Sequence, residues 1–429
     1  MKVLHLSASD NNGGAARAAF RLHYGLIQKG IESQMFVREK TTDNESVTRF
    51  KYPKGLKKAE YSFCKYLIGN SIKKYLTKRP KGFEVFSDDR SPLKTGFFNQ
   101  LPDADIYNLH WISGFVDLPS FFKKINKPIV WTLHDMFPFT GGCHYNSGCE
   151  NYLWYCHRCP QLGSKVERDL SYQIWARKLK AISEFKNRLI IRADSYWLAN
   201  EAKRSSLFKD LDIDTIHYGI ETDEFIFRNK IACRTALNIP VNSRVIVFGA
   251  PDITNPRKGL KQLNEALQRV RLKYQDLFLL SFGAGGIAAK QDIPNLHLGH
   301  VANNHLLSLI YNCGDVFVIP SLQEAFGQTA LEAMSCEIPV VGFNTGGIPD
   351  MIINGKTGYM AETGNTNNLA EAINEVLSLH HNDYIKMGEN CRQKVLEGFT
   401  ILHQAKKYAN VYNQLEEKFQ QKISALINK

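Results

Sequence analysis

The chain has 429 residues, of which 44% are hydrophobic, and its formal net charge at neutral pH is +12. This length predicts two domains that each bury a core, and the composition is ordinary for a folded protein. No apolar run approaches the roughly 18 residues that cross a bilayer, and the first residues turn polar too early for a secretory signal. We therefore expect a cytoplasmic protein rather than a membrane-spanning or secreted one.

The chain begins with a predicted strand at residues 3–8, a loop with two glycines, and a helix at residues 15–28. A strand, a glycine turn and a helix in this order open a doubly wound α/β sheet, whose ligands bind where the strands end. Further strands are predicted at 34–37, 105–110 and 128–134. Their ends carry His110, His134 and Asp135. Histidines at strand ends are also common structural residues, so both interpretations stay open.

Residues 49–81 hold eleven Lys or Arg side chains and a single acid, interleaved with Tyr, Phe, Leu and Ile. A basic segment of this kind can lie on an acidic bilayer, which predicts a peripheral contact with the inner face of the membrane. An ordinary surface helix with a lysine-rich outer face explains the pattern equally well. Nucleic acid is not an expected partner, because no nucleic-acid-binding signature accompanies the charge.

Residues 141–163 form a predicted cysteine-rich insertion in the first domain. Four of the nine cysteines fall within it, namely Cys143, Cys149, Cys156 and Cys159. In a reducing compartment, clustered thiols favour a metal over disulfides. A four-thiolate zinc site would be structural, because four protein ligands leave no open position for chemistry. Only the last two cysteines have standard zinc spacing, so disulfides and free thiols remain alternatives.

The strand–helix pattern restarts at residues 244–250 and continues into a helix that spans 258–274. Arg257 and Lys258 place two cations at the start of this helix, where acids are usually preferred. Cations at this position make sense if a pyrophosphate lies between them and the backbone amides. Two solvated charges are the alternative.

A strand at residues 315–319 ends in a loop that contains Glu324, and a predicted helix that follows contains Glu332. The helical rise places the two acids roughly 10 Å apart, about the distance from a hexose to the ribose of its nucleotide. The helix start leaves backbone N–H groups that suit hydroxyl or phosphate ligands. These N–H groups lie near Phe326, Gly327 and Gln328. Alternatively, the first acid is a loop charge and the second lies on a solvated face.

The stretch from Pro320 to Asp350 reads PSLQEAFGQTALEAMSCEIPVVGFNTGGIPD. It resembles the E-x7-E signature of retaining glycosyltransferases of family 4, in which P-S, E-x-F/A-G, L-E-A-M, P-V-V and G-G-x-P-[ED] occur in that order. Its one departure is Asp350, where glutamate is commoner. The resemblance extends over the whole chain and is strongest from Val245 to Gly358.

The resemblance implies the α/β fold called GT-B, with two Rossmann-like doubly wound domains that face each other across a cleft. We place an acceptor-side domain at 1–230, a nucleotide-sugar-binding domain at 231–403, and a C-terminal helix at 404–429 that crosses back to the first domain. The implied enzyme moves a sugar, with retention, from a nucleotide diphosphate sugar to a hydroxyl of a glycan or lipid-linked acceptor. It needs no cofactor or metal for catalysis.

The resemblance also implies roles for individual residues. Glu324 would hold the donor sugar, Glu332 the ribose, and Lys258 the diphosphate. Arg257 would replace an arginine that the family places just after the preceding strand, where this chain has Ala250 and Pro251. His300 and Val301 would contact the nucleobase, and Gly13 and Gly14 would lie near the donor phosphates.

On the acceptor side, the sequence Thr-x-His-Asp is similar to the family pattern in which the histidine approaches the reacting sugar. The matching residue here is His134, with Asp135 as its orienter or as an acceptor contact, and His110 is a further acceptor-side candidate.

Two other functions stay open. A nucleotide-sugar epimerase shares the architecture and would form product from the donor alone. A non-enzymatic basic protein would bind nucleic acid or membranes, with a steep salt dependence for nucleic acid, and would hydrolyse no donor.

A metal-dependent transferase is disfavoured. Such an enzyme would use an Asp-x-Asp motif, which the chain has at Asp103–Asp105 and Asp212–Asp214. Both motifs stand at the entrance of an apolar run, which is the wrong end of a strand for a ligand.

Overall fold

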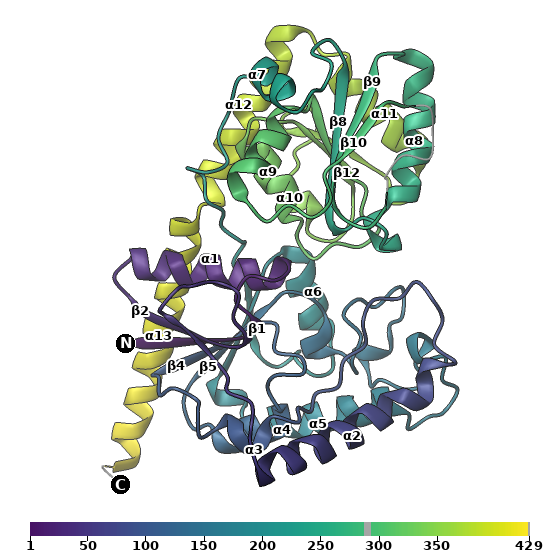
Figure 1. Cartoon of the computed structure of the whole chain (residues 1–429). Helices are drawn as coiled ribbons and strands as arrows, with labels where there is room; N and C mark the ends of the chain where they lie inside the picture. The colour runs from purple at the N-terminus through teal and green to yellow at the C-terminus, as the bar shows by residue number, and fades with distance from the viewer. Residues whose placement is uncertain (287–292, 428–429) are drawn as a thin grey trace. The chain divides into compact units, whose positions relative to one another are not determined.

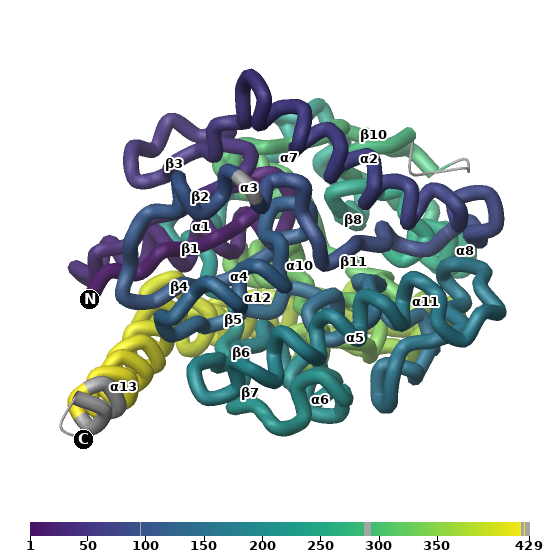
Figure 2. The backbone as a smooth tube through the Cα atoms, turned by 90° about the horizontal axis from the view of Figure 1, so that it is seen from below, coloured from purple at the N-terminus to yellow at the C-terminus, as the bar shows by residue number. Residues whose placement is uncertain are grey.

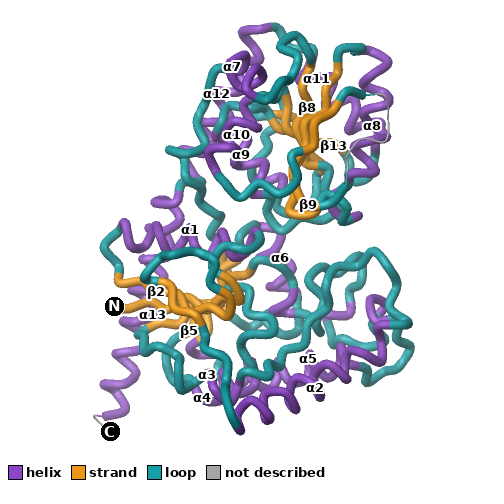
Figure 3. Tube along the Cα trace, viewed as in Figure 1, coloured by secondary structure: helices purple, strands orange, loops and turns teal. Residues whose placement is uncertain are grey.

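The computed structural model describes residues 1–286 and 293–427 (Figure 1). It contains two compact units, one formed by Met1–His217 with Leu402–Lys429 and the other by Tyr218–Ile401. Residues 287–292 of the expected second domain and 428–429 of the expected C-terminal segment lie outside the described residues. Each unit is an α/β sandwich in which helices flank a central sheet (Figure 3).

Within the described part of the chain, the first unit is built on seven strands in the order β3-β2-β1-β4-β5-β6-β7, and all neighbouring strands are parallel. The strands are β1 (Lys2–Ser9), β2 (Glu32–Glu39), β3 (Val47–Arg49), β4 (Ile106–Leu109), β5 (Ile129–Leu133), β6 (Leu189–Ala193) and β7 (Asp212–Thr215). Every residue of the central strands β4, β5 and β6 is buried. Continuous apolar runs are expected there, because helices cover both faces of a parallel sheet.

Helices connect these strands along the first unit. They are α1 (Gly14–Gln28), α2 (Leu56–Leu76), α3 (Lys94–Phe97), α4 (Leu118–Lys124), α5 (Leu170–Ser183) and α6 (Tyr196–Arg204), with short 3-10 turns η1 (Phe137–Phe139), η2 (Asn151–Leu153), η3 (Pro160–Leu162) and η4 (Lys186–Arg188). Side chains that accept from the backbone cap several of them, as Asp117 does for α4 and Ser195 for α6.

The last helix, α13 (Ile401–Ile427), packs on the sheet of the first unit (Figure 2). Tyr408 and Tyr412 are fully buried in one apolar cluster with residues of β1, β4, β5 and β6. Their hydroxyls also bond to polar groups of the sheet: Tyr412 accepts from Asn108 at 2.7 Å, and Tyr408 lies 2.9 Å from Thr132 Oγ1. The predicted return of the C-terminal helix to the first domain is therefore confirmed.

The second unit repeats the design on six described strands in the order β10-β9-β8-β11-β12-β13, again with all neighbours parallel. The strands are β8 (Arg244–Asp252), β9 (Leu277–Ala284), β10 (Asn295–His297), β11 (Val316–Ile319), β12 (Val340–Phe343) and β13 (Gly358–Ala361). The connecting elements are α7 (Lys230–Ala236), η5 (Pro256–Lys258), α8 (Leu260–Lys273), α9 (Asn304–Asn312), α10 (Gln328–Ser335), η6 (Ile348–Asp350), α11 (Thr366–Leu377) and α12 (His381–Gly398).

The chain enters the second unit after His217, whereas we expected the boundary at residue 230. The physical reason is that hydrogen bonds join the entering segment to α12 and to the residue after it. The N–H of Ile220 donates to the carbonyl of Phe399 at 2.9 Å, and Arg392 donates to the carbonyls of Thr222 and Phe225 at 2.8 and 2.5 Å. These bonds attach residues 218–225 to the second unit before α7 begins.

In each sheet, the chain adds its first strands on one side and its later strands on the other. The chain adds β2 and β3 on one side of β1 and then continues with β4 on the other side; β8, β9, β10 and β11 follow the same rule. In open α/β sheets ligands bind at the carboxyl ends of the strands at such a switch point. The predicted architecture of two doubly wound, Rossmann-like units is confirmed, and it places a candidate site in each unit.

Candidate active site

In the second unit, three loops meet at Glu324, which follows β11. Gly259, before α8, has a φ of +73°, and a Cβ on it would lie 1.7 Å from the carbonyl oxygen of Pro320. Gly346, after β12, has a φ of +56°, and a Cβ on it would lie 1.7 Å from the carbonyl oxygen of Glu324. Both positions require glycine, because the backbone is left-handed and the neighbouring main chain leaves no room.

Glu324 is surrounded by donors. Its Oε2 accepts from Lys258 Nζ at 2.6 Å and from Ser321 Oγ at 3.1 Å, and Arg257 lies 3.6 Å from the same oxygen. Burial alone would raise the pKa of Glu324, but the charges of Lys258 and Arg257 and the bonds from Lys258 and Ser321 outweigh it and lower the pKa. The carboxylate is therefore ionised, and the cluster of two cations and one anion carries a net positive charge.

Arg257 is fixed by a second contact, since its guanidinium donates to the carbonyl of Gln323 at 2.6 Å. The N–H of Leu322 donates in return to the carbonyl of Arg257 at 2.8 Å. The predicted cations and the predicted acid therefore belong to one hydrogen-bonded group at the ends of β8 and β11.

The second acid, Glu332, lies on α10 and is 2% exposed. Its Oε2 accepts from the hydroxyl of Tyr311, on α9, at 2.8 Å. Glu324 is 9% exposed. The alternative of a solvated loop charge and a solvated helix face is therefore excluded by burial.

The start of α10 lies between the two acids. Gly327 is its N-cap residue with a φ of +107°, and no side chain caps the helix there. Phe326 is buried and packs edge-on against Tyr218, with ring centroids 5.2 Å apart. The packing of Phe326 thus fixes the backbone at the point where residues 326–328 enter the helix.

The predicted nucleobase residues, His300 and Val301, follow the edge strand β10. β9 and β8 separate that strand from β11, so these residues share the carboxyl edge of the sheet with Glu324 but lie further along it. The turn before them is held by the N–H of Gly283, which donates to the carbonyl of Gly299 at 2.7 Å.

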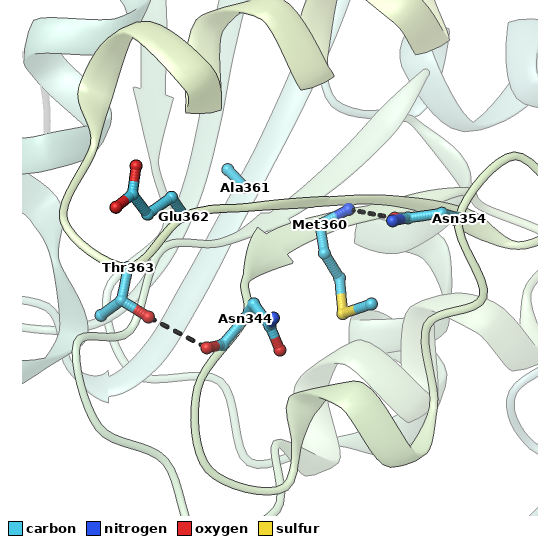
Figure 4. Close-up of a pocket in the computed structure, with 6 residues that line it drawn as sticks. All are labelled: Asn344, Asn354, Met360, Ala361, Glu362 and Thr363. Carbon is cyan, nitrogen blue, oxygen red and sulfur yellow. Dashed lines mark hydrogen bonds between the residues drawn. The ribbon is translucent and has the colours of Figure 1, made fainter.

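A shallow polar hollow of about 440 Å³ lies at the carboxyl ends of β12 and β13 (Figure 4). It is lined by Asn344, Asn354, Met360, Ala361, Glu362 and Thr363. Two bonds hold its rim: Thr363 Oγ1 donates to the carbonyl of Asn344 at 3.0 Å, and the N–H of Met360 donates to Asn354 Oδ1 at 2.7 Å. None of the residues predicted from the sequence lines this hollow.

In the first unit, His134 and His110 are joined in a chain of histidines. His134 Nε2 lies 3.0 Å from Nδ1 of His110, and Nε2 of His110 lies 2.8 Å from Nδ1 of His5, on β1. Both nitrogens of His110 are thus used inside the protein, and the residue is 2% exposed. His110 is therefore placed to support His134 rather than to meet an acceptor directly.

Asp135 belongs to a second network. Its Oδ2 lies 2.7 Å from Nδ1 of His144 and accepts from Trp111 Nε1 at 3.0 Å, while Ser87 Oγ lies 2.8 Å from Nε2 of His144. Burial alone would raise the pKa of Asp135, but the bond and charge of His144 outweigh it and lower the pKa. The histidine that Asp135 orients through these bonds is His144.

Gly13 and Gly14 form the turn between β1 and α1. Gly13 has a φ of +93°, and a Cβ on it would meet no atom within 4 Å. Asp10 anchors the loop, because its carboxylate accepts from the backbone and hydroxyl groups of Thr41 and Thr42 at 2.7 to 3.1 Å. The turn itself explains the glycine at position 13.

The predicted zinc site is not supported. Among the described residues, no three His, Cys, Asp or Glu side chains are arranged to hold a metal ion, and all four cysteines of the insertion are free thiols. Cys143 and Cys159 pack with Phe86, Leu162 and Ile174 in an apolar cluster. Burial raises the pKa of Cys143 to about 11 and that of Cys159 to about 12, so these thiols are neutral and pack as small apolar groups.

A buried lysine supports the start of the insertion. Lys178, on α5, is 1% exposed, donates to the carbonyls of Phe137 and Thr140, and lies over the Phe137 ring. Burial lowers the pKa of Lys178 to about 8. Hydrogen bonds and apolar packing thus order the loop that we expected a metal to hold.

Several residues that bond to the predicted ones, or to one of their partners, had no role predicted from the sequence. They are His5, Ser87, Trp111, His144 and Tyr311. The available signal was a histidine within the apolar run of β1, where an uncharged polar side chain needs a partner.

Comparison with known proteins gives this geometry a context. Residues 234–394 match the family described as "Glycosyl transferases group 1". The N-acetyl-alpha-D-glucosaminyl L-malate synthase of Bacillus anthracis is 26% identical over 234 residues, or 52% of this chain and 59% of that protein. A D-inositol 3-phosphate glycosyltransferase of Mycolicibacterium vanbaalenii is 28% identical over 183 residues, or 39% of this chain and 40% of that protein. These matches thus span about half the length of the curated relatives.

Solved structures extend the likeness to the whole chain. Sucrose-phosphate synthase from Thermosynechococcus elongatus aligns with a TM-score of 0.66 at 17% identity, over 97% of this chain and 99% of that one. Alr3699/HepE from Anabaena, solved in complex with UDP and glucose, aligns with a TM-score of 0.64 at 14% identity, over 96% and 99%. At these identities the likeness shows the fold. The chain has the GT-B architecture, and residues 234–394 of its second unit are similar to the glycosyltransferase group 1 family.

Proposed function

We propose that the protein is a retaining glycosyltransferase of family 4. It would transfer a sugar from a nucleotide diphosphate sugar to a hydroxyl of a glycan or lipid-linked acceptor, without a catalytic metal. The observation that carries the proposal is the cluster at the switch point of the second sheet, in which the buried Glu324 meets the half-buried Lys258 and Arg257, with Glu332 buried on the helix that follows. The names of the relatives, a synthase of a glucosaminyl malate and an inositol-phosphate glycosyltransferase, support it.

The donor is assigned to the second unit. Lys258 and Arg257 bind the diphosphate, because their cluster is positive and lies at the carboxyl ends of β8 and β11. Glu324 binds hydroxyls of the sugar, and Glu332 binds those of the ribose. The backbone at the start of α10 completes the phosphate site, His300 and Val301 contact the base, and Gly13 and Gly14 lie near the donor phosphates.

The chemistry follows from where charge develops. When the bond between the anomeric carbon and the diphosphate oxygen breaks, negative charge grows on the leaving phosphate. Lys258, Arg257 and the N-terminus of α10 stabilise that charge, so the scheme calls for no metal ion. The acceptor oxygen forms the new bond on the same face and gives its proton to the leaving phosphate. No protein base is required, and His134 contacts the reacting sugar.

The acceptor side is assigned to the first unit, and helix α2 suggests a lipid-linked acceptor. None of its residues, all of which the structure describes, is buried. It carries five lysines together with Phe63 and Tyr66, which are 62% and 64% exposed. Exposed aromatic and basic side chains suit the surface of an acidic bilayer. Among the described residues, no helix combines the length and the hydrophobicity that a membrane span requires.

Flotation with acidic vesicles tests this surface. We expect the protein to bind, and the triple variant Lys57→Glu, Lys58→Glu and Lys65→Glu to lose binding. Lys261→Glu combined with Lys386→Glu is the control, since both side chains are exposed and belong to the second unit. Equal binding by wild type and the α2 variant would remove the membrane from the proposal.

The transfer reaction is tested in two steps. A thermal-shift screen of nucleotide sugars identifies the donor, because a ligand that binds only the folded state raises the melting temperature. The selected donor is then incubated with glycan and lipid-linked acceptors, and the anomeric configuration of the product is read by NMR. A retained configuration supports the proposal, inversion contradicts it, and product from donor alone indicates the epimerase.

A further inference from the structure

The three linked histidines cross the switch point of the first sheet. His5 lies within β1, His110 directly follows β4, and His134 directly follows β5, so each comes from a neighbouring strand. Consecutive rings are 5.1 and 5.2 Å apart and tilted by 29° and 31°. Exposure rises along the chain, from 0% for His5 to 2% for His110 and 8% for His134. The three linked histidines therefore lead from the core to the carboxyl edge of the sheet.

All three rings are neutral at neutral pH. Burial lowers the pKa of His5 and of His110 well below the ordinary value, and lowers the pKa of His134 to about 4. A neutral imidazole carries one N–H donor and one acceptor nitrogen. His110 therefore donates through one nitrogen and accepts through the other, and both hydrogen bonds must run in the same direction.

The surroundings of His5, the innermost of the three histidines, determine this direction. Nε2 of His5 is buried and has no hydrogen-bond partner among the described residues. If the bonds ran from His134 toward His5, this nitrogen would carry an N–H with nothing to receive it. Buried N–H groups without an acceptor are rare in proteins, and rarer than buried acceptors without a donor. The bonds therefore run from His5 Nδ1 to His110 Nε2, and from His110 Nδ1 to His134 Nε2.

We propose that His5 and His110 are positioning residues that hold His134 as the tautomer with its proton on Nδ1. With Nε2 accepting from His110, Nδ1–H is the donor through which His134 acts on other groups. This inference rests on the proposed function for its purpose, which is to direct a hydrogen bond at an oxygen of the reacting sugar. The assignment of the tautomer stands on the first unit alone.

The groups around the chain are consistent with a neutral His134. His23, on α1, lies edge-on to His5 and bonds to Ser33 and Ser46, and burial lowers its pKa to about 4. The charge of Asp135 favours protonation of His134 but is outweighed by burial.

The tautomer can be read directly on the full-length protein labelled with ¹⁵N-histidine. Long-range proton–nitrogen correlation spectra distinguish the protonated from the bare ring nitrogen, and His134→Asn assigns the signals. We expect a protonated Nδ1 and a bare Nε2 for His134 in the absence of any substrate. A protonated Nε2 in the wild type would overturn the proposal.

Two substitutions of His110 test the mechanism. His110→Gln keeps one donor and one acceptor, whereas His110→Leu keeps neither. We expect His110→Leu to shift His134 toward the other tautomer and to lower kcat about tenfold with KM for the donor nearly unchanged, and the glutamine variant to recover most of both. An unchanged His134 spectrum in the leucine variant would overturn the proposal.

A second pair keeps the test open if His110→Leu fails to fold. His5→Leu and His5→Gln apply the same logic one step further from His134. The two hypotheses fail differently: full activity of His134→Ala would remove His134 from the reaction but leave its tautomer as assigned. The wrong tautomer in an active enzyme would contradict only the positioning role.

Discussion

The two units bury polar groups at equivalent places in their sheets but by opposite means. At the switch point of the first sheet, His5, His110 and His134 are neutral and share protons along one line. At the switch point of the second sheet, Glu324 is ionised and held by Lys258 and its neighbours. Burial is tolerated because hydrogen bonds link the neutral rings in the first unit, apart from Nε2 of His5, and because opposite charges pair in the second.

The difference affects which ligands each site suits and how much stability a substitution costs. A charged cluster suits an anionic ligand such as a diphosphate, whereas a neutral chain suits a hydroxyl, whose recognition depends on which atom donates. Removing one member of a buried ion pair leaves an uncompensated charge, at a cost of about 3 kcal/mol or more. Removing one member of a neutral chain costs about 1 to 3 kcal/mol. Substitutions in the two units should therefore differ in how much stability they cost and in how that cost depends on pH.

The largest effect is expected for Lys258→Ala in the charged cluster. The variant loses a cation for the leaving phosphate and leaves Glu324 with Arg257 as its remaining nearby cation. We expect kcat/KM for the donor to fall at least about a hundredfold. Lys261→Ala, on α8 just after the turn that contains Lys258, is the control, because the Lys261 side chain is 83% exposed. Comparable activity of the two variants would remove Lys258 from the donor site.

Glu332→Gln should have a smaller effect. The amide keeps the size of the side chain but no longer offers a charged acceptor to ribose hydroxyls, so we expect donor affinity to fall by about 30-fold. Isothermal titration of the variant and of Tyr311→Phe measures this. Tyr311→Phe should weaken binding less, since it removes only the donor to Glu332. A stronger effect of Tyr311→Phe would mean that Glu332 acts on the fold rather than on the ligand.

The neutral chain predicts an acid-sensitive first unit. The pKa of His5 is lower in the folded than in the unfolded protein, so below about pH 6.5 the unfolded chain binds protons that the folded unit excludes. Stability is thus lost as the pH falls from about 6.5, and for His23 and His134 the loss continues to about pH 4. In His5→Gln the loss should be shallower by about 1.4 kcal/mol per pH unit.

Tryptophan fluorescence isolates this transition, because all five tryptophans lie in the first unit. Urea unfolding at a series of pH values would give the free energy of unfolding of that unit for both proteins. The same pH dependence for wild type and His5→Gln would mean that His5 is protonated in the folded state.

The smallest effect is expected for Ser87→Ala, beside the acceptor-side candidates. The substitution removes the partner of Nε2 of His144, and we expect the first unit to lose about 1 kcal/mol of stability. Ser183→Ala, at an exposed position on α5, is the matched control. Equal stability of the two variants would show that the bond between Ser87 and His144 contributes nothing.

Local pattern was enough to predict the fold and to single out the residues that form the charged cluster. Alternating strands and helices with glycine turns specify a doubly wound sheet, and the spacing of Glu324 and Glu332 fixes them to one loop and the helix after it. Lys258 could be named because it comes just before the helix that follows β8, the strand next to β11. In each case the signal lies within a short stretch of sequence.

The partners could not be predicted in the same way. His5 and His110 are 105 positions apart and meet only because β1 and β4 are neighbours in the sheet. The predicted zinc site is not supported, for a related reason: spacing along the chain shows that the thiols are close in sequence but not whether their side chains surround one ion or pack among apolar side chains. Contacts across elements depend on packing, which a local pattern does not contain.

The most direct test of the account is whether Lys258 contacts the second phosphate of the donor nucleotide. Isothermal titration would compare the nucleoside diphosphate of the selected donor with its monophosphate, in the wild type and in Lys258→Ala. We expect the monophosphate to bind the wild type at least about tenfold more weakly than the diphosphate does. For Lys258→Ala, we expect the two nucleotides to bind with nearly the same affinity. An equal loss of affinity in both proteins would contradict it.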